Sequence, residues 1–584
     1  MRPRPNIWRA LVRRSVLLLL AGFSLLCPRY VKAAEPRDKP GVPFQMYRSA
    51  EELWKAGKHE AAAEEYLRIV EKNPGHEKAY IGVNYAAVFF IRAKRYNKGL
   101  ETYERLVREY PNSDLTQHAT KQVARVADEL FDFNKAIRFY DLLVRRYPEH
   151  EDRPEAARLV AVYRDALGDR RGAIRAYRRY LKLYPRAQDA AAIHLRIAQI
   201  QRDSGNRRGM LRTLKQFLHR GAGPQDHSQV LEAHLIIGDH HRDRGKSLRN
   251  RRKKRAALRR SRESYEQAMR YFEAQGLPMG RAEARLAGRA AFERAELDLQ
   301  ELRRPFGGRA LRSKKTFEKA IKRQLKQKMR LVDDLREQYE KVMRYGDAEL
   351  YMAATYRIAE NAWTFAELIV TAPLPPGERP QGRGIYDEYR PPISDAMLPF
   401  HEKAVQGFRI VIESAERNKH HSQWVTRARQ ALAELRPEEY KANRPPRSIL
   451  LGPGGRTELP SQSQVPIPDP QTARQAREVA REARTELSGD PHDVARHVAL
   501  ARALLDLGDY QGAEREAIWA LQRYGRNLQF IILIGDIHAA RGRPLLADLV
   551  YTRALEMYPD NADLWFRRAC HLVDAAVSAG PNRE

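Results

Sequence analysis

The sequence predicts an all-α protein built as a solenoid of stacked helix hairpins. Three observations predict it: prolines recur every 37 residues, alanine, glycine and tyrosine columns accompany them, and a related pattern returns near the C-terminus every 34 residues. Proline costs about 3 kcal/mol inside a helix, so a periodic proline marks the end of each second helix. One hairpin cannot bury its apolar face alone, and the hairpins are therefore expected to stack.

The first 33 residues are typical of an export signal. Arginines precede an unbroken apolar run at 16–26, and small residues precede the expected cleavage site between Ala33 and Ala34. The run spans about 17 Å, short of a hydrocarbon core of about 30 Å, so a cleaved signal is favoured over a permanent anchor. Both the Sec and the twin-arginine routes stay open, and Leu26 disfavours a lipoprotein signal at Cys27. The mature chain is expected in the periplasm.

Composition excludes several classes of protein. The 584 residues include 106 Lys and Arg against 74 Asp and Glu, a net charge of +32, and 43% are hydrophobic. This hydrophobic share is enough for a core and argues against wholesale disorder. The only cysteines are Cys27 and Cys570, which excludes a disulfide-stapled scaffold and a cysteine-based zinc site. Whether Cys570 pairs between chains stays open.

Residues 34–225 form the predicted N-terminal array. A tyrosine stands eight residues before each periodic proline, and a small residue stands four residues before the tyrosine. This spacing puts both on one helix face, where the small residue lets two helices approach and the tyrosine fills the space beside it. The predicted packing residues are Ala62, Tyr66, Pro74, Gly99, Tyr103, Pro111, Ala136, Tyr140, Pro148, Ala173, Tyr177 and Pro185.

Residues 471–584 form a second predicted array, separate from the first, with a period of 34. Its predicted packing residues are Gly508, Ala513, Gly542, Ala547 and Pro559. Residues 436–470 contain eight prolines and almost no apolar periodicity, so they are predicted to be a linker. Between the two arrays, residues 226–435 form a predicted helical middle region, in which a basic insert, residues 242–262, separates two helices.

These columns resemble the tetratricopeptide repeat (TPR), whose small-residue, aromatic and proline positions they match. Leu-Gly-Asp-Tyr at 507–510 and Ala-Leu-Glu-Met-Tyr-Pro at 554–559 are further matches to this family. The resemblance implies a hairpin solenoid that binds other proteins. The order of residues over 40–440 also resembles the large TPR proteins of the myxobacterial cell envelope, including those of the gliding-motility machinery. That resemblance implies a place in an envelope complex for motility or transport.

The sequence matches none of the common catalytic motifs that we considered. The sequence contains no phosphate-binding loop of the Gly-x-x-x-x-Gly-Lys type, no Gly-x-Ser-x-Gly and no Gly-x-Gly-x-x-Gly. His76-Glu77 and His401-Glu402 lack the second histidine of a metalloprotease helix. We therefore expect no enzyme activity, no catalytic or metal-binding residues and no cofactor.

The candidate binding site is the face of the first helices. The TPR resemblance implies that these helices line a groove, and mapping the groove positions onto this chain gives Asn84, Arg92, Lys121, Arg125, Arg158 and Arg202. A mostly cationic groove, with Asp128 and Glu129 interspersed, suits an acidic peptide or a terminal carboxylate. An ordinary solvated helix face is the alternative.

The basic insert has three interpretations, because it holds twelve Lys and Arg and one acid, Asp243. It is a solvated flexible segment, a contact with an anionic membrane or cell-wall surface or acidic partner, or a nucleic-acid contact, against which the export signal argues. The candidate contacts are Arg249, Arg251, Arg252, Lys253, Lys254 and Arg255. The predicted function is a periplasmic protein-binding scaffold of an envelope complex. The alternative is an accessory factor for outer-membrane or surface-polymer assembly.

Overall fold

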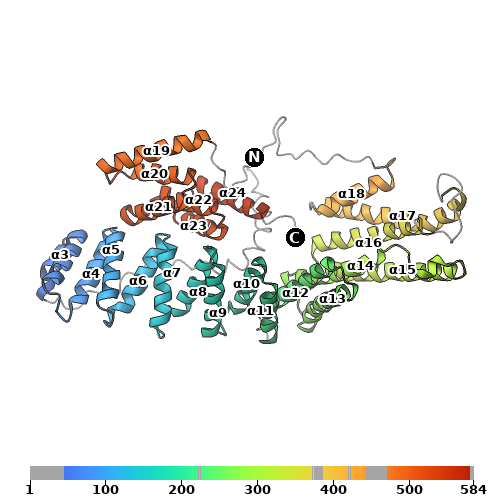
Figure 1. Ribbon diagram of the computed structural model, residues 1–584, viewed down its shortest axis with the longest axis horizontal. Coiled ribbons are helices and arrows are strands. Elements are labelled where there is room, and N and C mark those ends of the chain that lie inside the picture. Colours follow the sequence, from blue (N-terminus) through green and yellow to red (C-terminus); the bar gives the residue numbers. More distant parts are fainter. Residues whose placement is uncertain are drawn as a thin grey trace. The chain divides into compact units, whose positions relative to one another are not determined.

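The computed structural model describes residues 45–220, 223, 225–370, 372–373, 386–418, 420, 422–440 and 470–578. Within these residues the chain forms 23 α-helices and no strand, which confirms the predicted all-α solenoid (Figure 1). In the same ranges, no helix has the length and apolar character needed to span a membrane. The predicted signal peptide, with Cys27, and most of the predicted linker lie outside the described residues.

The helices group into two compact units. The first contains the helices of residues 45–193 and 470–578, and the second contains those of residues 194–440. The division falls within α10 (Ala190–Asp203). The predicted domain boundaries stay predictions. The first unit combines the C-terminal array with the larger part of the predicted N-terminal array, whose residues from His194 onward belong to the second unit.

The N-terminal array of the first unit is a row of helix pairs. Each periodic proline comes two residues after the end of a second helix, as the steric cost of proline in a helix requires. Consecutive helices pack against each other along the row. After a 3-10 turn at Gln45–Tyr47, the pairs are α2 (Arg48–Lys55) with α3 (His59–Lys72), α4 (Ala79–Arg92) with α5 (Tyr96–Glu109), α6 (Leu115–Glu129) with α7 (Phe133–Arg146), and α8 (Arg153–Ala166) with α9 (Arg170–Leu183).

The predicted packing columns lie inside this row. Ala62, Ala136 and Ala173 are fully buried, and the tyrosines of their column are buried or half-buried. A Cβ atom at Gly99 would lie 2.5 Å from Cδ1 of Ile91, so the glycine permits the close approach of α4 and α5. The small residues thus set the distance between paired helices, and the aromatic rings occupy the volume beside them.

The C-terminal array, also in the first unit, has the same construction. Gly508 and Gly542 have φ angles of +76° and +64°, a conformation that favours glycine, and they form the turns between paired helices. A Cβ atom at Gly535 would overlap the ring of Tyr551, which again shows a close helix approach. The helices are α19 (Pro470–Gly489), α20 (Val494–Asp506), α21 (Tyr510–Tyr524), α22 (Leu528–Ala540), α23 (Pro544–Met557) and α24 (Ala562–Ser578).

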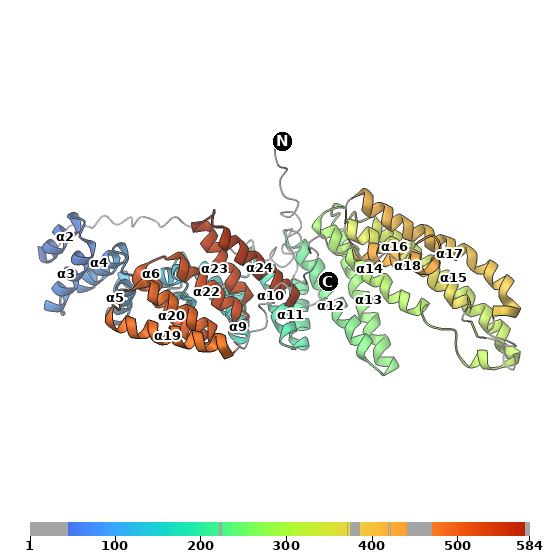
Figure 2. The ribbon, with the colours of Figure 1, turned by 90° about the horizontal axis from the view of Figure 1, so that it is seen from above.

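The second unit is built from longer helices, each packed mainly on its neighbours in sequence (Figure 2). One core of this unit surrounds the fully buried side chains of Tyr265, Leu335 and Tyr339. A second core surrounds Phe408 and Trp424. After α10, the helices are α11 (Arg207–Arg220), α12 (His227–Ser247), α13 (Arg251–Ala274), α14 (Ala282–Leu302), α15 (Lys314–Met343), α16 (Ala348–Val370), α17 (Tyr386–Arg417) and α18 (Gln423–Leu435), with a 3-10 turn at Arg309–Arg312.

The basic segment differs from its prediction as an insert between two helices. Its first six residues complete α12, and from Arg251 onward it forms the first half of α13. Lysine and arginine are good helix formers, and the buried side chains of Ala257 and Ser261 give this half of α13 an inward face. The Ser261 hydroxyl also donates a 2.8 Å hydrogen bond to the Gly238 carbonyl, which fixes α13 on α12.

Candidate protein-binding site

The predicted groove residues lie on the first helices of consecutive pairs. Asn84 and Arg92 are on α4, Lys121 and Arg125 on α6, and Arg158 on α8, all in the first unit. The sixth residue, Arg202, is on α10 in the second unit, where its exposed side chain pairs with Asp203. We call α4, α6 and α8 together the first-helix face.

Most cations of this face already have partners within the array. Lys121 forms ion pairs with Asp152 and Glu151, and the Arg158 Nε donates a 2.8 Å hydrogen bond to Glu155. Arg92 is exposed and lies 5.7 Å from the centre of the Phe89 ring. These local pairs offset much of the positive charge that an acidic ligand would need.

Acidic groups at the end of α6 make the longer-range contacts. We call Asp128, Glu129 and Asp132 the acidic corner. The Arg553 guanidinium of α23 donates through Nη1 to Asp128 Oδ1 at 2.8 Å and through Nη2 to the Tyr163 hydroxyl at 3.0 Å. The Tyr163 hydroxyl in turn donates to the same Asp128 oxygen at 2.7 Å. The C-terminal array therefore contacts the first-helix face through a closed triangle of hydrogen bonds.

The centre of this contact is buried. The side chains of Arg553 and Asp128 are each 12% exposed. Burial disfavours the charged guanidinium, but the nearby Asp128 carboxylate and Tyr163 outweigh it and raise the pKa of Arg553 well above its usual value. Burial raises the pKa of the Tyr163 hydroxyl, and the Asp128 carboxylate raises it further, whereas the Arg553 guanidinium lowers it by less than burial raises it. Arg553 is therefore charged, and Tyr163 is neutral, at all physiological pH values.

The edge of the contact is more open. Arg526 pairs with Glu129 at 2.7 Å, with both side chains about one-third exposed, and Gln522 donates to Asp132 at 3.4 Å. Away from this edge, the buried ring of His538 lies 6.0 Å from the buried ring of Phe133. The two arrays also contact each other through whole helices, because α21 packs on α5 and α23 packs on α8 (Figures 1 and 2).

Sequence reasoning noted Asp128 and Glu129 but gave them no role. One signal for them is electrostatic: α6 ends in two acids and has no basic residue in its last turn. Carboxylates at a helix C-terminus are unfavourable with the helix dipole, so they call for an outside cation. The identity of that cation has no local signal, since Arg553 is 425 residues away.

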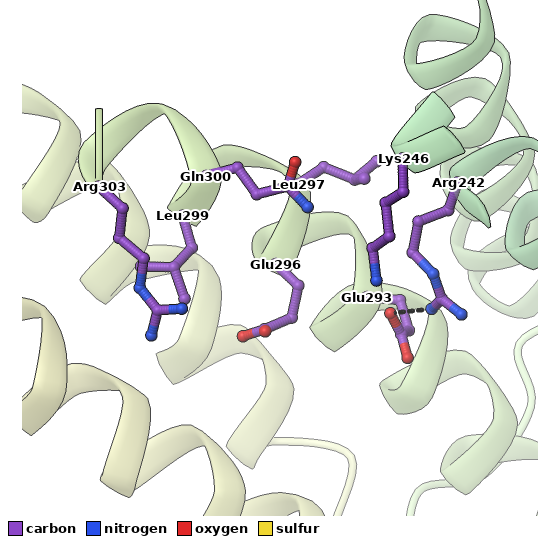
Figure 3. A pocket seen from close by; sticks show the side chains of 8 residues that line it. All are labelled: Arg242, Lys246, Glu293, Glu296, Leu297, Leu299, Gln300 and Arg303. Atoms are coloured by element: carbon purple, nitrogen blue, oxygen red, sulfur yellow. Dashed lines mark hydrogen bonds and ion pairs between the residues drawn. The ribbon is translucent and has the colours of Figure 1, made fainter. Parts of the chain in front are cut away.

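A small cavity of about 200 Å³ lies in the second unit, between α12 and α14 (Figure 3). Its lining alternates in charge: Arg242 pairs with Glu293, and Glu296 accepts hydrogen bonds of 2.8 and 2.9 Å from Arg357. Tyr339 donates to the same Glu296 at 2.7 Å. These pairs neutralise one another, which is typical of a structural network. In the described ranges, no three His, Cys, Asp or Glu side chains are placed to hold a metal ion.

The predicted anionic-surface residues cluster where α12 meets α13. Arg249, Arg251, Arg252, Lys253 and Arg255 are exposed, and Lys254 is half-buried. The Asn250 side chain caps α13 by accepting from the Lys253 backbone N–H at 3.0 Å. These cations lie near the N-terminus of α13, which is the positive end of the helix dipole. The first turn of α13 contains no acid that would offset their charge. The cluster therefore keeps its positive charge.

Comparison with known proteins confirms the repeats. Family models described as tetratricopeptide repeat match residues 47–114, 158–187 and 498–562. Both arrays therefore contain TPRs, which makes the chain a protein–protein interaction scaffold. The matches to solved structures give no support to the resemblance to myxobacterial motility proteins, and no curated protein matches the sequence.

Three similar solved structures illustrate the breadth of the match. MamA of AMB-1 is 16% identical, with 31% of this chain and 93% of that chain covered and a TM-score of 0.21. A tetratricopeptide repeat protein from Parabacteroides merdae is 16% identical, with 48% and 100% covered and a TM-score of 0.21. Naa15/Naa10 bound to HypK-THB is 13% identical, with 92% and 97% covered and a TM-score of 0.29.

Proposed function

We propose that this chain is an exported scaffold that binds a partner protein on the first-helix face of its N-terminal array, within a cell-envelope complex. The observation that carries the proposal is the unbroken row of first helices, α4, α6 and α8, which holds the predicted polar side chains on successive repeats. Stacked repeats present such a row as an extended binding surface. A role in motility or transport rests on the sequence resemblance alone.

Capture from envelope fractions tests the binding face. Full-length wild type is compared with the double variant Arg92→Glu and Lys121→Glu on first helices, and with a matched double variant, Arg108→Glu and Arg145→Glu, on second helices. We expect the same partner in the wild type and the second-helix variant, and its loss from the first-helix variant. Equal capture by all three would refute the proposed face.

Export is tested separately. Expression of the full gene followed by fractionation and N-terminal sequencing should give a periplasmic chain that begins at Ala34. An uncleaved chain in the cytoplasmic fraction would refute export.

Contact with an anionic envelope surface is a second candidate function, as an accessory factor for outer-membrane or surface-polymer assembly. The observation in its favour is the exposed basic cluster at the start of α13, for which no ion pair is described. Each basic side chain near an anionic surface contributes about 1 kcal/mol. Five of them are enough for measurable attachment, which salt would weaken.

Vesicle co-sedimentation tests this candidate with two variants of equal charge change. One replaces Arg251, Arg252, Lys253, Lys254 and Arg255 with glutamine. The other replaces five cations that are exposed near the start of α15: Arg312, Lys314, Lys315, Lys319 and Arg323. We expect the first variant alone to lose binding to phosphatidylglycerol vesicles. Equal loss by both variants would indicate attraction by net charge rather than a site.

A further inference from the structure

We infer that the acidic corner is a binding site for an arginine-presenting helix, and that the chain's own C-terminal array occupies it in a closed state. A partner of the same chemistry then competes with Arg553 for this site. This deepens the proposed function, because it names a chemical class of partner for the same face. It also differs from the acidic ligand that the cationic residues alone would suggest.

The site is shaped for a guanidinium group. Arg553 is 12% exposed and reaches two different acceptors, a carboxylate oxygen of Asp128 and the hydroxyl of Tyr163. The planar fork of arginine spans two such acceptors, whereas the single ammonium of lysine does not match both directions. Its Nη1 also donates to the Asp128 backbone carbonyl at 3.2 Å, at the C-terminal end of α6. Arginine is therefore favoured over lysine here.

Closure depends mainly on this central triangle. The Arg526–Glu129 pair at the edge is about one-third exposed, and exposed pairs contribute little. The helix contacts between the two arrays include α21 with α5 and α23 with α8, together with the ring contact of His538 on α22 with Phe133 on α7. Removing one partner of a buried charged pair leaves the other charge uncompensated, which is costly. Losing Arg553 should therefore shift the chain from closed to open.

Competition follows from the occupancy of the corner. While Arg553 is bound, Asp128 and Tyr163 already have their hydrogen bonds, so an outside arginine gains nothing there. The apparent affinity for a partner is lowered by the fraction of chains that are open. Because the C-terminal array is tethered to the same chain, its effective concentration is high, and a free partner must exceed it.

Complementary full-length variants test the inference without an outside partner. Arg553→Asp removes the arginine and leaves the acidic corner free, while Asp128→Arg removes the corner and leaves Arg553 free. Closure is measured by energy transfer between dyes on cysteines at two exposed positions, Glu101 on α5 and Glu556 on α23, with Cys27 and Cys570 changed to serine. Association of the two variants is measured by light scattering on mixing.

We expect each single variant to increase the ratio of open to closed chains by about 100-fold or more. The double variant, which restores the pair in reverse, should recover much of the transfer. The two single variants should form a mixed dimer at high micromolar concentration, and neither should self-associate. The matched controls are two single variants, Asp548→Arg and Arg568→Asp. Each breaks an ion pair inside the C-terminal array and should leave the energy transfer as high as in the wild type.

Two results would overturn the inference. Wild-type transfer in both single variants would mean that Arg553 does not hold the arrays closed. Open single variants that stay monomeric when mixed would mean that the corner does not accept an arginine-bearing helix from outside. Circular dichroism checks the helix content, and the neutral variant Arg553→Gln replaces Arg553→Asp if the latter unfolds. Mixed-dimer formation without partner capture would refute the proposed partner-binding function and leave this inference standing.

Discussion

Acidification should destabilise the first unit through one histidine. His538, on α22, is fully buried, and neither ring nitrogen has a hydrogen-bond partner among the described residues. Burial, with smaller contributions from Arg543 and Arg541, lowers its pKa to about 3. A histidine with a lowered pKa contributes stability above its unfolded-state pKa of about 6.5 and loses it progressively as the pH falls towards about 3.

The expected loss follows from this difference in pKa. Each pH unit below about 6.5 costs about 1.4 kcal/mol, so the free energy of unfolding should fall by about 2 kcal/mol between pH 7.5 and pH 5 because of His538 alone. In His538→Leu this contribution is absent. Urea unfolding followed by circular dichroism at the two pH values gives the difference between wild type and variant. Other buried histidines titrate equally in both proteins and cancel.

The matched control is His492→Gln, because His492 is exposed and its loss should leave the pH dependence of the wild type unchanged. If His538→Leu loses as much stability as the wild type between pH 7.5 and pH 5, then the buried imidazole is not the titrating group. That result would refute the reasoning.

Three further substitutions test packing and buried charge by thermal or urea unfolding. Gly238→Ala places a methyl group against the Tyr265 ring and should lower the free energy of unfolding by about 1–3 kcal/mol. Its control, Gly75→Ala, has no atom within 4 Å of the added Cβ and should change that free energy by less than about 0.5 kcal/mol. Equal effects of the two variants would contradict the close approach of α12 and α13. Arg357→Ala leaves the Glu296 carboxylate with its hydrogen bond from Tyr339 but without the Arg357 cation, and should lower the free energy of unfolding by about 3–5 kcal/mol. A decrease below about 1 kcal/mol would argue against a stabilising network. Lys328→Ala removes the ammonium donor to the Leu302 and Arg304 carbonyls at the end of α14 and should lower the free energy of unfolding by about 1–3 kcal/mol. An unchanged unfolding midpoint would contradict this expectation.

The helix boundaries were predictable because their signals are local. A proline such as Pro111 ends a helix by its own steric and hydrogen-bonding limits, and Gly508 supplies a turn conformation that other residues avoid. The sequence predicts the basic segment as an insert because its many charges obscure a weak apolar periodicity. Its inward positions are small, as at Ala257 and Ser261, so they give little hydrophobic signal.

The site was less predictable because charge type does not reveal charge pairing. Lys121 and Arg158 lie on first helices, and the acids that pair with them, Asp152 and Glu155, belong to the same array. In the sequence, Asp128 is distinguished only as an acid among cations. Its partner, Arg553, lies in a different array, and no periodicity links two positions so far apart in the chain.

The separation of 425 residues between Asp128 and Arg553 has a consequence for biosynthesis. A ribosome adds about 5–20 residues per second, so roughly 20–85 s pass between the two residues. During that interval the early repeats can form their local helix contacts, but Asp128 has not yet formed its ion pair with Arg553. A message truncated before codon 553 would therefore yield a chain whose first repeats fold while the Asp128 carboxylate has no Arg553 to pair with. That carboxylate could then bind an arginine-bearing helix of another protein.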